Sequence, residues 1–579
     1  MRKNSFIYWI FGVSLWMSCS SGNAGLAETD SKTLRLDTDK ACYYPGEVVT
    51  IKASKKVDGQ VFVRYRYLDK ILGEEKWNQK EWTWMPPADD YKGYMVEVYE
   101  KRGNKECTLG SIAVDVSSDW KKFPRYGFLS HYSHITPDQI KKNIAFLNRH
   151  HINGVQYQDW HYKHHQPMAG TVSCPKKEWT DIANRKVDKS IVDDYISETH
   201  RYGIKSIFYN LCFGVLEDAQ RDGVDAGWFL YKDNAQKERD KHSLPSDWKS
   251  DIYLVNPGNA DWQKYLVNEN AKVYHTFDFD GYQIDQLGSR GEVYDSQGNR
   301  IDLPAGYLSF IHAMKHACPD KRLVMNAVSE YGQEQIAEGE VDFFYNEVWG
   351  EDAEFTDLVR ILENNRRWND NLSTVFAAYM NYNVADHEGY FNTSGILLTD
   401  AVMFAFGASH LELGEHMLGK EYFPNNNLKM KEDLKTALVH YYDFLVGYQN
   451  LLRDGGTFNE VELSCNDEKI KVAAWPPRYQ HVAAVGKKQD NRQLVHLINL
   501  AQATSLDWRD VDGKQPEPDW VENVSLNLKT SEPVKRLWVA SPDINNGLPQ
   551  VIAFDRNASG ISFVLPGLKY WDMIIVEYK

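Results

Sequence analysis

The sequence predicts a multidomain chain: a central (β/α)8 TIM barrel at residues 120–452, an N-terminal immunoglobulin-like β-sandwich at 33–118 and a C-terminal β-sandwich at 455–579. Three observations predict this fold. The 579 residues are enough for two to four domains. The middle of the chain alternates strand and helix patterns, which is typical of folds with a parallel sheet. Both ends are rich in short strands separated by turn residues.

The first folded part carries the signature of a small sandwich. Residues 33–37, 48–52, 61–65 and 94–99 alternate apolar and polar side chains, as half-buried strands do. Turn residues such as Tyr44-Pro45-Gly46-Glu47 separate these strands. Short strands over about 85–100 residues indicate an immunoglobulin-like fold.

The middle of the chain contains eight βα units, which favours a closed barrel over an open sheet. The predicted strands are 126–130, 154–158, 206–210, 281–286, 323–327, 342–347, 374–379 and 408–413. The predicted helices are 137–149, 260–277, 305–318, 355–368 and 429–451. Thr136 is the expected N-cap of the first helix, with Pro137 at its first position. The long connection after the third strand is expected to cover the barrel mouth.

The sequence pattern of the last folded part again predicts strands, at 482–485, 494–498 and 573–578. These segments predict the second β-sandwich.

The first residues predict export. Arg2 and Lys3 precede an apolar run at 6–17 that is too short to span a bilayer, and small residues follow it. This predicts a signal peptide over residues 1–19. Cys19 stands where bacterial lipoprotein signals place the acylated cysteine, so we expect a lipid-anchored protein of the bacterial cell envelope; a plain signal peptide is the alternative. No later apolar run reaches about 18 residues, so no transmembrane helix is predicted.

Composition excludes several function classes. The net charge of −15 disfavours general nucleic-acid binding, because such a chain repels phosphate backbones. No glycine-rich nucleotide loop and no metal-ligand spacing of Cys or His is present, so no cofactor and no metal are expected. Cys42 and Cys107 fall in the same sandwich, where either a disulfide or two free thiols is consistent with the sequence.

Two carboxylates end apolar strands of the predicted barrel. Asp285 ends the fourth strand and Glu347 ends the sixth, at the strand ends where barrel active sites form. One such acid alone is also consistent with capping a helix or pairing with an arginine. Together, two facing acids are what cleavage of a glycosidic bond requires. A metal-dependent hydrolase would instead need clustered histidine ligands, and no H-x-H or H-E-x-x-H motif is present.

Other strand ends are polar or aromatic, which suits a sugar: aromatic faces stack on its C–H surface and polar groups bond its hydroxyls. A single residue of this kind is more often structural, but most strands share the character. The candidate substrate contacts are Tyr132, Asp159, Trp160, His164, Asn210, Gln286, Trp349, Tyr379 and Glu412.

Several segments resemble glycoside hydrolase family 66, which comprises endo-dextranases and cycloisomaltooligosaccharide glucanotransferases. They are the runs 44–47 and 90–94, the segment 157–164 with Gln158 inserted, the Asp285 strand, the run 345–349 and the segment 410–417. The resemblance covers nearly the whole mature chain and implies the same three-domain architecture.

The resemblance implies a retaining reaction on α-1,6-glucan, with dextran and isomaltooligosaccharides as the partners. Asp285 would be the nucleophile and Glu347 the acid/base. The glucanotransferase branch carries an extra carbohydrate-binding module in the catalytic region, and the residues after Glu347 leave no room for one, which favours hydrolysis. Two alternatives stay open: a glucanotransferase, and a non-catalytic surface glycan-binding lipoprotein.

Overall fold

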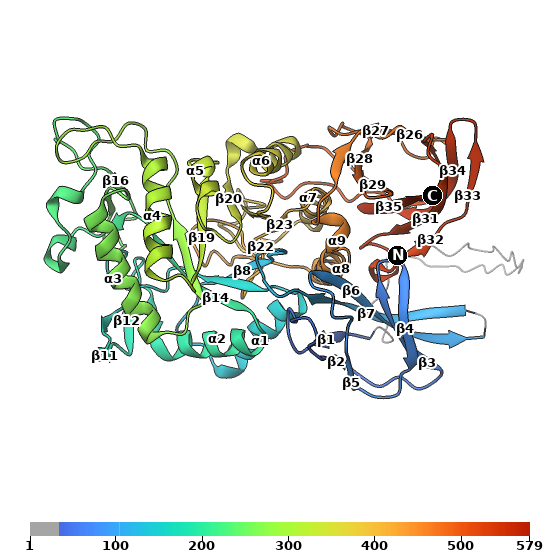
Figure 1. Cartoon of the computed structure of the whole chain (residues 1–579), viewed down its shortest axis with the longest axis horizontal. Helices are drawn as coiled ribbons and strands as arrows, with labels where there is room; N and C mark the ends of the chain where they lie inside the picture. Colours follow the sequence, from blue (N-terminus) through green and yellow to red (C-terminus); the bar gives the residue numbers. More distant parts are fainter. Residues whose placement is uncertain (1–33, 104) are drawn as a thin grey trace, which may run out of the picture.

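The computed structural model describes residues 34–103 and 105–579, and its three β-rich or α/β parts follow one another along the chain (Figure 1). The predicted signal peptide and Cys19 lie outside the described residues. Within the described residues, none of the helices is both long and apolar enough to cross a bilayer.

Eight parallel strands pair in chain order around the central barrel. The strands are β8 (Tyr126–Leu129), β9 (Gly154–Tyr157), β14 (Lys205–Leu211), β18 (Gly281–Asp285), β19 (Arg322–Val328), β20 (Phe344–Val348), β21 (Thr374–Ala378) and β23 (Ser409–His410). The ring closes where the Phe128 amide donates to the Leu413 carbonyl at 3.2 Å. The predicted barrel is confirmed, with every strand within a few residues of its expected place.

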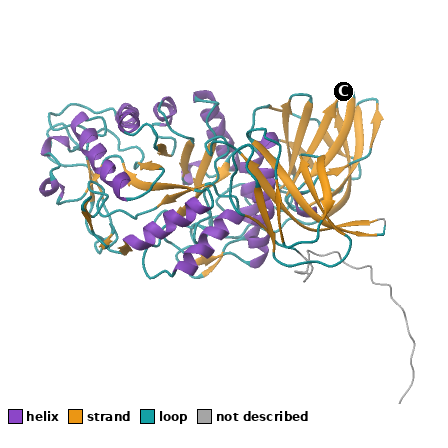
Figure 2. Cartoon of the chain, turned by 60° about the horizontal axis from the view of Figure 1, so that its bottom comes forward, coloured by secondary structure: helices purple, strands orange, loops and turns teal. Residues whose placement is uncertain are grey.

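Helices cover the outside of this sheet (Figure 2). They are α1 (Pro137–Arg149), α2 (Lys189–Arg201), α3 (Ala260–Thr276), α4 (Leu303–Ala317), α5 (Gln333–Glu338), α6 (Phe355–Trp368), α7 (Thr393–Ala405), α8 (Glu432–Gly447) and α9 (Gln449–Leu452). The predicted cap of α1 is confirmed, since the Thr136 hydroxyl accepts from the Gln139 amide at 3.2 Å. The single helix expected at 429–451 is wrong: it is interrupted at Tyr448 between α8 and α9.

The long connection between β14 and β18 carries structure of its own. A small antiparallel sheet forms there from β15 (Gly214–Val215), β16 (Lys241–His242) and β17 (Ile252–Leu254). It precedes α3 and packs into the main core of the barrel, to which Val215, Ile252 and Leu254 belong. This is the decorated loop that the sequence predicts.

Two sheets form each flanking sandwich, and their strands are antiparallel except for β27, which pairs in parallel with β28. The N-terminal sheets contain β1 (Leu36–Thr38), β2 (Val49–Ala53) and β5 (Glu81–Trp84), and β4 (Lys70–Lys76), β3 (Val61–Tyr67), β6 (Lys92–Arg102) and β7 (Lys105–Val116). Cys42 and Cys107 are free thiols in this domain, and Cys42 Sγ donates to the Ser117 carbonyl at 3.2 Å.

The C-terminal sandwich closes the chain. One sheet contains β25 (Thr457–Asn459), β27 (Val472–Ala474), β28 (Val482–Gln489), β29 (Arg492–Asn499), β35 (Trp571–Tyr578), β31 (Val534–Ala540) and β32 (Gln550–Val551). The other contains β26 (Leu463–Cys465), β30 (Val521–Lys529), β34 (Gly560–Leu568) and β33 (Phe554–Asn557).

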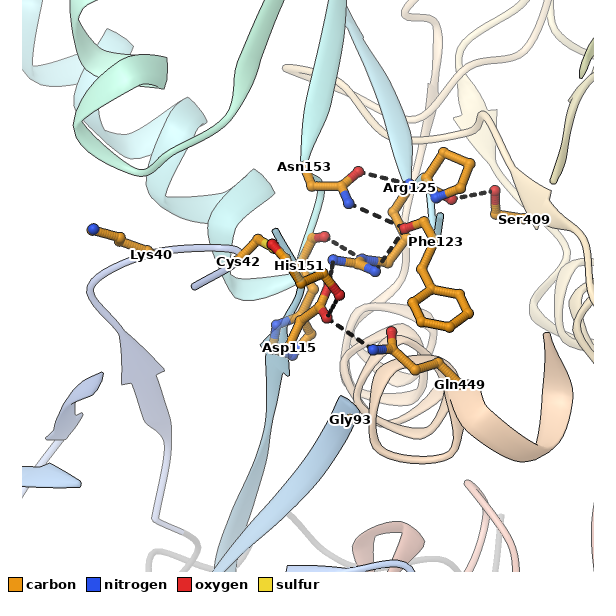
Figure 3. Close-up of polar contacts among 12 residues, drawn as sticks. Lys40, Cys42, Gly93, Asp115, Phe123, Arg125, His151, Asn153, Ser409 and Gln449 are labelled. Carbon is orange, nitrogen blue, oxygen red and sulfur yellow. Dashed lines mark hydrogen bonds and ion pairs between the residues drawn. The ribbon is translucent and has the colours of Figure 1, made fainter. Parts of the chain in front are cut away.

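The two sandwiches lie together on one side of the barrel (Figures 1 and 2). Arg536 of the C-terminal sandwich pairs with Asp69 of the N-terminal one at 2.8 Å. Arg125, just before β8, joins the N-terminal sandwich to the barrel: its guanidinium donates to Asp115 of β7 at 2.7 Å, and both side chains are fully buried (Figure 3). The three parts therefore form one packed body.

Candidate active site

The candidate site is built from alternate residues of neighbouring strands. Successive side chains of a strand point to opposite faces, so every second residue of a barrel strand faces inward. On β18 and β20 these positions include Asp285 and Glu347, which line a cavity of about 410 Å³ at the carboxyl ends of the strands. Inward residues of the strands between and beside them surround the two acids, as expected of the layered interior of a TIM barrel.

One amide joins the two carboxylates. Asn326 Nδ2, on β19 between the two strands, donates to Asp285 Oδ1 and to Glu347 Oε2, each at 2.8 Å. Because both oxygens lie 2.8 Å from the same nitrogen, they cannot be farther apart than twice that distance. The two acids therefore face each other at close range across the cavity.

Two tyrosines hold the other carboxylate oxygens. The Tyr209 hydroxyl of β14 donates to Asp285 Oδ2 at 2.7 Å. The Tyr379 hydroxyl, just after β21, donates to Glu347 Oε1 at 2.8 Å. Each acid is thus fixed by two donors, and no arginine or lysine neutralises either of them within the described chain.

The two acids differ in their protonation. Burial and the charge of Asp285 raise the pKa of Glu347 to about 7, although Asn326 and Tyr379 donate to it. Burial also raises the pKa of Asp285, against the hydrogen bonds from Asn326 and Tyr209. Glu347 is consequently the acid that keeps its proton up to neutral pH, as a general acid must.

Five of the nine predicted substrate contacts line the cavity: Asp159, His164, Gln286, Trp349 and Tyr379. The Asp159 carboxylate pairs with Arg185 at 2.9 Å, and burial raises its pKa to about 6. The Trp349 ring lies against the Tyr379 ring, with 5.4 Å between their centroids. These residues combine polar groups with an aromatic wall.

The other four predicted contacts do not line the cavity, and the structure corrects these predictions. Asn210 occupies an outward-facing position of β14 and bonds the His164 ring at 2.8 Å. Glu412 follows β23 and accepts from Tyr442 of α8 at 3.0 Å.

The remaining two are core aromatics. Tyr132 stacks on Tyr157 and donates to the Leu129 carbonyl at 2.6 Å. Trp160 is fully buried against Phe277 and Phe279. An aromatic residue after a strand therefore does not by itself show whether the side chain lines the cavity or belongs to the hydrophobic core.

Some lining residues were absent from the predicted site. Tyr209 and Asn326 donate hydrogen bonds to the acids, but the sequence analysis did not predict them as site residues. They occupy inward-facing positions on the strands next to Asp285 and Glu347, so the alternation of side chains along those strands is the signal that indicates them. Loop residues had no such signal. They are His242, Leu244 and Trp248 from the β14–β18 connection, and Glu421 and Tyr422 from the loop after β23.

Two acidic clusters elsewhere have the spacing of metal ligands. His165, Asp218 and Asp222 lie close together, but Lys163 Nζ bonds both aspartates, at 2.7 and 2.6 Å. Asp400, His410 and Glu412 form the other, in which the His410 ring nitrogens bond Asp400 and the Ala378 carbonyl. Neither cluster lines the cavity.

A barrel with two facing acids and an aromatic wall defines a glycoside hydrolase. The sequence model of glycosyl hydrolase family 66 matches residues 38–575, and the chain belongs to this family.

The similar proteins have one of two activities. A cycloisomaltooligosaccharide glucanotransferase of Niallia circulans is 25% identical, over 97% of this chain and 74% of its own. A dextranase of Streptococcus salivarius is 22% identical, over 84% of this chain and 67% of its own. A crystal structure of a Paenibacillus cycloisomaltooligosaccharide glucanotransferase with cycloisomaltoheptaose superposes with a TM-score of 0.85 at 24% identity, covering 93% and 99% of the two chains.

Proposed function

We propose that this chain is an exported endo-dextranase that hydrolyses α-1,6-glucosidic linkages with retention and releases isomaltooligosaccharides. The observation that carries the mechanism is the Asn326 bridge. It keeps Asp285 Oδ1 and Glu347 Oε2 no farther apart than twice its 2.8 Å bonds, which agrees with the separation of about 5–5.5 Å in retaining glycosidases better than with the about 6.5–9.5 Å of inverting ones.

In this mechanism the two acids have separate tasks. Asp285 attacks the anomeric carbon and forms a β-glucosyl ester, while Glu347 gives its proton to the departing glycosidic oxygen. Glu347 then takes a proton from water, which attacks the same carbon and releases the α-anomer. Asn326 and Tyr209 orient Asp285, and Asn326 and Tyr379 orient Glu347.

We favour hydrolysis over cyclisation because this chain lacks segments that a glucanotransferase relative contains. The alignment with the Niallia glucanotransferase extends over 731 positions, more than the 579 residues of this chain, so that relative contains insertions absent here. Cyclisation remains the second candidate, because the glucanotransferases match a larger share of this chain than the dextranase does.

Chromatography of a dextran digest tests the proposal. We expect linear isomaltooligosaccharides of mixed length early in the reaction, with a rapid fall in polymer size and no comparable attack on starch or cellulose. Cyclic products would identify a glucanotransferase. Binding of dextran without any product would identify a glycan-binding protein, the third candidate.

The proposed lipid anchor depends on Cys19. In a bacterial host, Cys19→Ala should prevent lipid attachment and release the protein from the membrane fraction. Unchanged membrane association and processing of the variant would refute a lipid anchor at this position.

A further inference from the structure

A polar layer lies beneath the two carboxylates. Gln283 and Tyr345 come two residues before Asp285 and Glu347 on the same strands, so they face the same way one layer deeper, and Gln156 of β9 faces inward with them. Branched apolar residues dominate such layers in TIM barrels. Here all three polar side chains line the cavity of about 410 Å³.

The amide of Gln283 has no partner in the protein. Its side chain is 1% exposed, and it forms no hydrogen bond with any residue in the described part of the chain. The Oε1 atom of Gln156 is also buried without a partner, although its Nε2 donates to Gln158 at 3.0 Å. Buried polar groups are nearly always hydrogen-bonded, and leaving one unpaired costs about 1–3 kcal/mol.

Within this layer, Gln283 is the member that shares its strand with Asp285. Gln283 is also in register with Tyr209 on the neighbouring strand β14, and Tyr209 donates to Asp285 Oδ2. We therefore expect a ligand group that reaches Gln283 to belong to the sugar unit bound over Asp285, rather than to the leaving group beside Glu347.

We propose that Gln283, supported by Gln156, forms the floor of the subsite for the glucosyl unit that becomes attached to Asp285, and bonds a hydroxyl of that unit. The inference depends on the proposed function. A hydroxyl both donates and accepts, as does an amide with both ends free, so a neutral polyol suits the site better than an ion. Gln283 would then contribute to the selection of glucose units bearing that hydroxyl.

Analogues that lack one hydroxyl test this directly. The parent substrate is an aryl α-isomaltoside, and each analogue lacks the hydroxyl at carbon 2, 3 or 4 of the glucose next to the aryl group. With the wild type, one analogue should lose about tenfold in kcat/KM, the scale of one hydrogen bond. With Gln283→Leu, the parent should lose about as much and the same analogue should lose nothing further.

Two controls separate this effect from damage to the fold. Gln493→Leu removes a buried glutamine of the C-terminal sandwich, outside the cavity, and its analogue ratios should equal those of the wild type. Because Gln283 has no protein partner, Gln283→Leu should melt at or above the wild-type temperature; Gln283→Met provides a second variant of similar length.

The outcomes are distinct. If all three analogue ratios stay unchanged in folded Gln283→Leu and Gln283→Met, the amide bonds ordered water and the inference is wrong. If the wild type turns over neither this parent substrate nor dextran, the proposed function itself fails.

Discussion

At the residue scale, the environment gives two similar carboxylates different tasks. Both are buried and share the Asn326 donor, and burial raises the pKa of each; the charges of Asp285 and of Glu421 add to the rise at Glu347. The two hydrogen bonds from Asn326 hold the acids close together, while Glu347 keeps its proton up to about neutral pH. Removing either acid should have consequences that identify its role.

We predict that azide rescues the two alanine variants with opposite stereochemistry. On an aryl α-isomaltoside, Glu347→Ala still forms the β-linked ester, because the leaving group needs no acid; azide then attacks the opposite face and gives an α-glycosyl azide. In Asp285→Ala, azide can only attack the substrate itself and gives the β-azide.

The configuration is read by proton NMR of the isolated azide. Both variants should be inactive on dextran without azide. An α-azide from Asp285→Ala together with a β-azide from Glu347→Ala would mean that the roles are reversed.

We also predict a pH dependence set by Glu347. Its raised pKa keeps the acid protonated up to about pH 7, so kcat/KM should fall as the pH rises through about 7. The hydrogen bond from Tyr379 favours the ionised form, and Tyr379→Phe should therefore move this fall to higher pH. A kcat/KM that is constant between pH 6 and 9, or a fall that moves to lower pH in Tyr379→Phe, would contradict the assignment of Glu347 as the acid.

Sequence patterns indicated the two acids but selected their neighbours poorly. Asp285 and Glu347 were recognisable because each ends an apolar strand of the barrel. Asn210 also stands near a strand end, but it occupies an outward-facing position, which only the alternation along the strand reveals. Glu412 was predicted at a strand end but follows β23 and bonds Tyr442 of α8. The pairing of Asn326 with both carboxylates depends on strand neighbours, and no local pattern states it.

At the element scale, loops complete the cavity. Trp248 comes from the connection between β14 and β18, and Tyr422 from the loop after β23. Both line the cavity, and their rings meet edge to face with 5.7 Å between centroids. This contact bridges two loops over the sugar-binding space.

We predict that Trp248→Ala and Tyr422→Ala weaken the binding of long glucans. Loss of one aromatic wall should raise the KM for dextran about tenfold, the equivalent of 1.4 kcal/mol. The kcat on a short aryl substrate should change little, since the acids are untouched. Tyr479→Ala is the control, because this tyrosine is 54% exposed and does not line the cavity. An unchanged KM for dextran in both cavity variants would show that these loops bind no substrate.

The elements themselves were predicted in part, and the amphipathic helix α2 was missed although its buried apolar residues recur at helical spacing. All eight barrel strands were expected, but α7 was not, because twelve of its thirteen residues are buried and it lacks the polar face of a surface helix. The six-residue α5 is too short for a helical period to appear. Loop residues such as Trp248 are placed by long-range packing and could not be assigned to the site from the sequence.

At the scale of the whole molecule, buried ion pairs join the domains. Arg125 donates to Asp115 of the N-terminal sandwich and to the carbonyls of Phe123 and His151 (Figure 3). Within the barrel, Arg149 and His151 bond Asp443 of α8, and Asp443 in turn accepts from the Ala113 amide of β7 in the N-terminal sandwich at 3.0 Å. Although burial acts to raise it, the charge of Arg149 and the hydrogen bond from His151 hold the pKa of Asp443 well below its usual range.

We predict that Asp115→Ala destabilises the molecule by about 3–5 kcal/mol, because it leaves the Arg125 charge buried without a partner. Urea unfolding followed by fluorescence measures this. Asp37→Ala breaks the exposed pair with Arg35 and should cost less than about 1 kcal/mol. Equal, small effects of both substitutions would show that the Asp115 pair does not hold the N-terminal sandwich to the barrel.

The most direct test of the central claim is the anomeric configuration of the first reducing ends that the wild type releases from dextran, followed by proton NMR before mutarotation. The carboxylate separation set by Asn326 predicts that the α-anomer appears first and the β-anomer later. The β-anomer appearing first would contradict the retaining mechanism and the roles given to Asp285 and Glu347.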